Sequence, residues 1–140
     1  MGIIIPARNF SRDNVSGLLK PIIYCCPYED IADTAVPVNL PLAEKLAGCV
    51  PERRTLQIEN FFGQVLSRLP DDAVIRDIDV MFNPAYKVDV LRILTAAYKK
   101  KPFSVVWPGK YGDGKLFYAE NGDPDLKIYS IAEYDVTCIV

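Results

Sequence analysis

The chain has 140 residues, of which half are hydrophobic and 11% are aromatic, so it can form one domain with a buried core and is not a disordered chain. Its 16 basic and 18 acidic side chains give a net charge of -2, and we therefore expect no direct binding of nucleic acid. The sequence holds no histidine, which excludes a histidine-containing catalytic triad, a histidine-ligated zinc site and a histidine pH switch.

The first part of the chain predicts an arm followed by alternating strands and helices. Residues 1–20 are expected to form an N-terminal arm, and residues 21–140 a single α/β domain. Apolar runs bounded by prolines and turn residues predict strands at residues 21–26, 36–40, 73–82 and 103–107. Pro37 places the second of these strands at a sheet edge or at its own beginning. Helical spacing predicts helices at residues 41–47 and 55–69, and a third one capped by Asn83 and Pro84 that ends near Lys99.

This alternation predicts a mostly parallel central sheet with flanking helices. The pattern changes after Trp107, where glycine-rich turns separate two short apolar segments at residues 115–120 and 126–130. These segments predict a C-terminal β-hairpin, which is followed by a last strand at residues 135–140.

The four cysteines, Cys25, Cys26, Cys49 and Cys138, have no C-x-x-C spacing, and they are expected to be free thiols that act as small hydrophobic residues. No segment reaches the ~18 apolar residues that a membrane span needs. The first residues do not read as a signal peptide. We therefore expect a cytoplasmic protein without a membrane partner.

One candidate site is the acidic end of the strand at residues 73–82. Asp77 and Asp79 are two residues apart, so on a strand both side chains would point to one face of the sheet. With Asp89, Glu120, Asp123 or Asp125 nearby, they could bind magnesium and support phosphodiester hydrolysis. The alternative is that the two carboxylates pair with Arg76 or Lys87 at the exit of the strand.

A second candidate site is the aromatic turn that begins at Trp107. Together with Tyr111, Tyr118 and Tyr129 it could stack a nucleobase, cover the core or contact a partner protein. Tryptophan and tyrosine are favoured anchors of protein interfaces. We therefore predict that these four residues form a partner-binding surface.

A nucleotide-binding α/β domain would place a phosphate-binding loop directly after its first strand. Here that loop carries Glu29, Asp30 and Asp33. There is no glycine between Gly17 and Gly48 and no lysine between Lys20 and Lys45, so Thr34, the one hydroxyl candidate, has no lysine directly before it. A loop of this kind lacks the glycines and the lysine with which a P-loop holds the phosphates of ATP.

The stretch from Asn39 to Tyr129 resembles the BrxF family, the small P-loop proteins of type 3 BREX phage-defence systems. The similar segments are residues 38–46, the acidic run at 77–82, the helix at 88–94 and, most distinctively, the run from Trp107 through Tyr118-Ala119-Glu120 to Tyr129. The resemblance implies a P-loop fold with a phosphate-binding loop and a magnesium-holding aspartate.

The chain departs from this family at both of the implied positions. Residues 27–36 stand in place of the phosphate-binding loop, and Arg76 falls where the magnesium-holding aspartate would be, while Asp79 matches a second acidic position. We therefore expect a degenerate P-loop-like domain without catalysis, cofactor or metal, which works as an adaptor or assembly subunit of a phage-defence complex. The alternatives are a magnesium-dependent hydrolase that uses Asp77 and Asp79, or a regulator that binds ATP without hydrolysing it.

Overall fold

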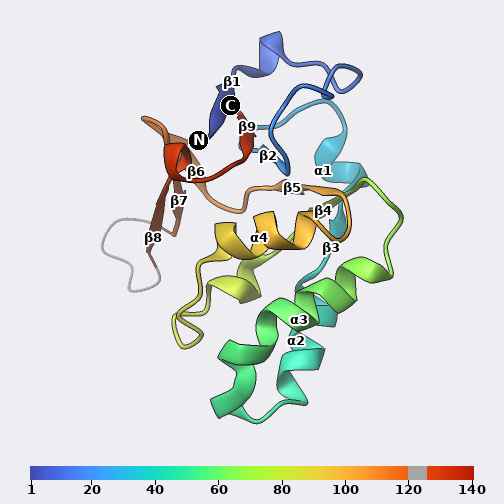
Figure 1. The fold of residues 1–140 in the computed structure, drawn as a ribbon, viewed down its shortest axis with the longest axis vertical. Coiled ribbons are helices and arrows are strands. Elements are labelled where there is room, and N and C mark those ends of the chain that lie inside the picture. The colour runs from blue at the N-terminus through green and yellow to red at the C-terminus, as the bar shows by residue number, and fades with distance from the viewer. Residues whose placement is uncertain (120–125) are drawn as a thin grey trace.

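A computed structural model describes residues 1–119 and 126–140, and it places a parallel six-stranded sheet at the centre of the fold (Figure 1). The strand order is β1-β9-β2-β5-β4-β3, and each neighbouring pair is parallel. The prediction of an α/β fold with a mostly parallel central sheet is confirmed. The strands are β1 (Ile3–Ile5), β2 (Ile22–Tyr24), β3 (Val36–Pro37), β4 (Ala73–Arg76), β5 (Phe103–Val106) and β9 (Thr137–Ile139).

The two faces of this sheet are covered by different parts of the chain. Side chains alternate along each strand, so Ile23, Ile75 and Val105 point into one hydrophobic core, which the long helices complete. Tyr24 and Ile139 point into a second, smaller core that is closed by the N-terminal segment and α1. The helices are α1 (Ile31–Thr34), α2 (Asn39–Ala47), α3 (Arg54–Ser67) and α4 (Val90–Tyr98), with short 3-10 turns η1 (Ala7–Asn9), η2 (Pro51–Arg53), η3 (Asp79–Phe82) and η4 (Ile131–Glu133).

The N-terminal segment is more than the arm that the sequence predicts. Residues 3–5 form β1, which pairs with the last strand, β9, at one edge of the sheet. Phe10 is buried in the second core. Ile3 pairs with Thr137, which is far away in the sequence. Local sequence patterns therefore could not predict this strand pairing.

Two predicted boundaries near the acidic segment are wrong. The predicted strand at residues 73–82 ends at Arg76, because Asp77 has a φ of +57° and turns the chain before η3 begins at Asp79. The helix predicted to start at Asn83 starts at Val90. Asn83 instead closes a turn by accepting a hydrogen bond from the Ala85 N–H at 3.0 Å, and Asp89 caps α4 by accepting one from the Arg92 N–H at 3.1 Å.

The C-terminal region forms a separate antiparallel sheet in the order β6-β7-β8, made of β6 (Lys110–Gly112), β7 (Lys115–Tyr118) and β8 (Lys127–Ser130). The predicted β-hairpin corresponds to β7 and β8 and is confirmed. The predicted turn between these strands falls on residues 120–125, which lie outside the described part of the chain. Gly109 leads into this sheet and lies so close to the Phe117 carbonyl that a Cβ atom would overlap it.

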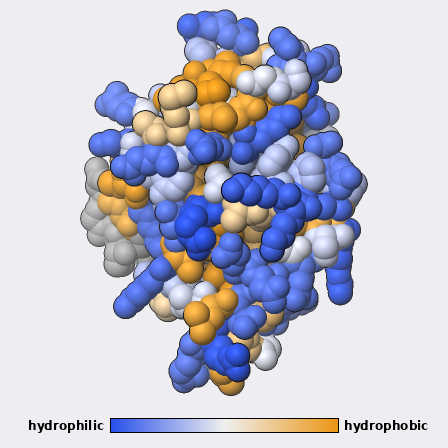
Figure 2. All heavy atoms as spheres, in the orientation of Figure 1, coloured by the Kyte–Doolittle hydropathy of each residue, from blue (hydrophilic) through white to orange (hydrophobic). Residues whose placement is uncertain are grey.

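The surface in Figure 2 is mainly hydrophilic, with hydrophobic groups over the N-terminal segment at the top and at the lower end, where α2 and α3 lie. Exposed large hydrophobic side chains on or beside these two helices are Leu40, Val50 and Leu56. In the described residues, none of the helices has both the length and the apolar character to cross a membrane.

Candidate functional site

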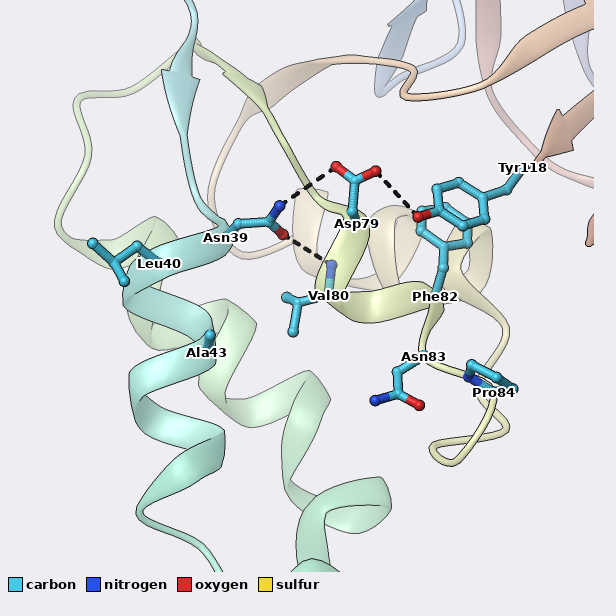
Figure 3. Close-up of a pocket in the computed structure, with 9 residues that line it drawn as sticks. All are labelled: Asn39, Leu40, Ala43, Asp79, Val80, Phe82, Asn83, Pro84 and Tyr118. Carbon is cyan, nitrogen blue, oxygen red and sulfur yellow. Dashed lines mark hydrogen bonds between the residues drawn. The ribbon is translucent and has the colours of Figure 1, made fainter. Parts of the chain in front are cut away.

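A groove lies at the carboxyl ends of β3 and β4, where parallel α/β folds commonly bind their ligands (Figure 3). It has a volume of about 780 Å³ and lies between α2 on one side and η3 on the other. Its lining is mostly apolar or neutral, and Asp79 is the one charged side chain in the described lining. The lining residues are Asn39, Leu40, Ala43, Asp79, Val80, Phe82, Asn83, Pro84 and Tyr118.

Asn39 joins the two walls of this groove. It is the first residue of α2, and its Oδ1 atom accepts a hydrogen bond from the Val80 N–H at 2.8 Å, while its Nδ2 donates to Asp79 Oδ1 at 3.4 Å. The Val80 N–H belongs to the first turn of η3, where backbone donors need partners from outside the helix. Asn39 therefore fixes the position of η3 against α2.

Asp79 accepts a second hydrogen bond from across the molecule. The Tyr118 hydroxyl donates to Asp79 Oδ2 at 3.1 Å, so each carboxylate oxygen has one neutral donor (Figure 3). The ring of Tyr118 is stacked on Phe82 with centroids 4.0 Å apart and planes 4° apart. Because Tyr118 is in β7, this contact attaches the small sheet to the groove.

The predicted partner surface is divided between the core and the groove. Trp107 and Tyr129 are only 5% and 6% exposed, and their rings meet edge to face at 6.0 Å. The indole N–H of Trp107 donates to the Phe117 carbonyl at 3.0 Å. These two residues belong to the core, whereas Tyr111 and Tyr118 are half-buried, and Tyr118 alone of the four lines the groove.

The two predicted acidic residues have different partners. Asp77 Oδ2 accepts a hydrogen bond from Arg76 Nη1 at 3.1 Å, and Arg76 Nε also donates to the Ala35 carbonyl at 3.3 Å. Asp79 instead faces Asn39 and Tyr118. The pairing with Arg76 that the sequence offered as an alternative therefore holds for Asp77.

This set of groups does not fit a magnesium ion, because a guanidinium lies beside Asp77, and Asp79 is engaged by an amide and a phenol. Within residues 1–119 and 126–140, no three His, Cys, Asp or Glu side chains are placed to hold a metal ion together. The further predicted ligands Glu120, Asp123 and Asp125 lie outside the described residues. Asp89 accepts hydrogen bonds from Tyr134 at 2.7 Å and from the Arg92 N–H.

The first part of the loop after β2, where a P-loop protein would hold phosphate, borders an apolar cavity. A cavity of about 210 Å³ is found there, lined in part by Cys25, Cys26, Pro27, Tyr28 and Trp107. A hydrogen bond with the Cys138 thiol, together with burial, raises the pKa of Cys25 far above its ordinary value, so this thiol stays protonated and is a poor nucleophile. All four cysteines are free, as predicted.

The charges on this loop are also unsuited to phosphate. Glu29 and Asp30 precede α1, and Arg12 of the N-terminal segment lies 3.9 Å and 3.8 Å from their carboxylates. Arg12 is therefore already paired with two carboxylates. Two carboxylates at this position would repel a phosphate group.

Comparison of the chain with protein-family models, with curated proteins and with solved structures finds no match. The functional assignment therefore depends on the chemistry of the groove and of the loop after β2.

Proposed function

We propose that this protein is a non-catalytic adaptor or assembly subunit that binds a partner protein through the groove at the ends of β3 and β4. The observation that carries this proposal is the hydrogen bonding of Asp79, the one carboxylate in the described lining. Both of its oxygens accept hydrogen bonds from within the protein, and the walls around it are apolar. An apolar groove with a few fixed polar groups is suited to binding.

The loop after β2 supports the same proposal. A nucleotide would need backbone N–H groups brought close by glycines and a lysine for its phosphates. This chain instead has an apolar cavity beside Pro27 and Tyr28, with Glu29 and Asp30 next to it. The fold and the nucleotide site are separable, so a P-loop-like domain can lose its nucleotide site and keep its use as a scaffold.

The proposed setting is a BREX-like phage-defence complex in the cytoplasm. This part of the proposal is supported by the sequence resemblance to the BrxF family. The four free thiols are compatible with a reducing compartment.

The proposal is tested by co-expressing the tagged chain with the other components of the defence system and identifying what co-purifies. Two leucines with similar exposure provide a matched pair, since Leu40 lines the groove and is 70% exposed, whereas Leu56 is 76% exposed on α3. We expect Leu40→Asp to lose the defence component and Leu56→Asp to retain it. Retention by both variants, or the absence of any defence component from the wild-type preparation, would contradict the proposal.

A further inference from the structure

The charge of Asp79 lacks a cationic partner among the described residues. The ion pairs of residues 1–119 and 126–140 do not include it, and Arg76, which is close in sequence, donates to Asp77 and to Ala35. Asn39 and Tyr118 donate to Asp79 as neutral groups, so they orient the carboxylate without balancing its charge. A carboxylate has about four acceptor positions, and two of those on Asp79 stay available.

The surroundings of Asp79 complement a long basic side chain. The Tyr118 ring borders the groove beside the carboxylate, with one face stacked on Phe82. Leu40 and Val80 provide apolar walls against which an aliphatic stem can pack. Arginine fits this combination better than lysine, because its planar guanidinium can donate two parallel hydrogen bonds to the two oxygens of one carboxylate.

We propose that the groove recognises an extended segment of a partner protein through an arginine side chain that pairs with Asp79, while apolar residues next to this arginine pack on Leu40 and Val80. This inference rests on the proposed function and names the chemistry of the partner. The negative charge on a mostly apolar lining is the reason for choosing a basic-apolar segment over an acidic or a purely apolar one.

The probe is a library of random linear peptides displayed on phage and selected against the full chain. Enriched peptides are then synthesised, and their affinities are measured for the wild type and for Asp79→Asn, which keeps the shape of the side chain and an oxygen that can accept from Tyr118. The control is Asp13→Asn, which makes the same charge change at an exposed carboxylate in the N-terminal segment. Thermal melts confirm that each variant is folded.

We expect the enriched peptides to carry an arginine, and we expect Asp79→Asn to weaken their binding about tenfold or more, as for a charge-assisted hydrogen bond. Asp13→Asn should change the affinity by less than about twofold, because an exposed charge at a distance is screened. Replacing the peptide arginine by glutamine should weaken binding to the wild-type protein. The same replacement should have little further effect on binding to the Asp79→Asn variant, because each change alone already removes the arginine–Asp79 pair.

The inference is overturned if no peptide is enriched, if the enriched peptides lack a basic residue, or if the arginine replacement costs as much with Asp79→Asn as with the wild type. Peptides without arginine that bind the wild type and lose binding with Leu40→Asp would overturn this inference and leave the proposed function in place. The two proposals therefore fail in different ways.

Discussion

The carboxyl edge of the main sheet has two regions with mostly apolar linings, of which the groove alone contains the Asn39–Asp79–Tyr118 network. At the ends of β3 and β4, Asn39, Asp79 and Tyr118 form a connected polar network on the floor of an open groove. α/β proteins often bind nucleotides at the end of the strand that corresponds to β2. Here a small apolar cavity lies at that place, lined in part by two thiols, Pro27 and Tyr28. The difference indicates that this sheet supports a binding groove at one place and a small apolar cavity at the place where a nucleotide is expected.

Aromatic contacts among Phe82, Trp107 and Tyr129 hold the small antiparallel sheet against the main sheet. Removing these contacts should cause the largest loss of stability among the changes considered. Trp107 is buried, and its ring lies nearly perpendicular to the rings of Phe82 and Tyr129. We expect Trp107→Ala to lower the free energy of unfolding by about 3–5 kcal/mol, as for other large buried aromatic residues. Chemical denaturation measures this change, and an unchanged stability would show that Trp107 is not part of the core.

Gly109, which leads into the small sheet, provides a second test with a smaller expected loss of stability. A Cβ atom at Gly109 would overlap the Phe117 carbonyl, so we expect Gly109→Ala to cost about 1–3 kcal/mol of stability through overpacking. Gly63 is the matched control, because it lies inside α3 with open space around its Cβ position. Gly63→Ala should raise stability by up to about 1 kcal/mol, since glycine is a poor helix former. Equal stability losses in the two variants would contradict the close approach at Gly109.

The polar network of the groove is tested by Asn39→Ala. This change leaves the Val80 N–H without its side-chain acceptor and removes one donor from Asp79. We expect a loss of about 1–2 kcal/mol in the free energy of unfolding, the usual range for leaving a half-buried polar group unpaired. Asn60→Ala serves as the control, because Asn60 is exposed on α3. If both variants are equally stable, Asn39 does not fix η3 against α2.

The smallest effect at neutral pH is expected for Tyr129→Phe. Burial raises the pKa of Tyr129 to about 12, while the unfolded chain releases this proton near pH 10. Between these pH values the folded state holds more protons than the unfolded state, so its stability falls as the pH rises. Tyr129→Phe removes this contribution, and its melting temperature should therefore fall less than that of the wild type between pH 10 and pH 12. Parallel curves for the two proteins would contradict the raised pKa.

The sequence predicted those features that local patterns determine. Runs such as Phe103–Val106 and the helical spacing of Arg54–Ser67 were sufficient to indicate strands and helices, and their alternation indicated a parallel sheet. Boundaries that depend on one backbone angle or one cap were missed. The positive φ of Asp77 ends β4 early, and the cap at Asp89 delays α4.

The candidate site was predicted only in part. Asp79 was chosen for its chemistry, but its hydrogen bond from Tyr118 joins residues 39 positions apart, and no local pattern reports such a contact. Asn39 falls inside the predicted strand at residues 36–40 and has no predicted role in a site, whereas in the structure β3 ends at Pro37 and Asn39 begins α2. A role in the core was one of the alternatives for the aromatic turn, but its local pattern does not separate Trp107 and Tyr129, which are buried, from Tyr118, which lines the groove.

The most direct test of the central claim, that this fold works by binding a partner and not through a nucleotide, is a thermal melt of the protein alone and with millimolar Mg-ATP. A ligand that binds only the folded state raises the melting temperature by mass action. We predict no change in the melting temperature. A clear rise would show that a nucleotide site exists in this protein and would contradict the proposed function at its main point.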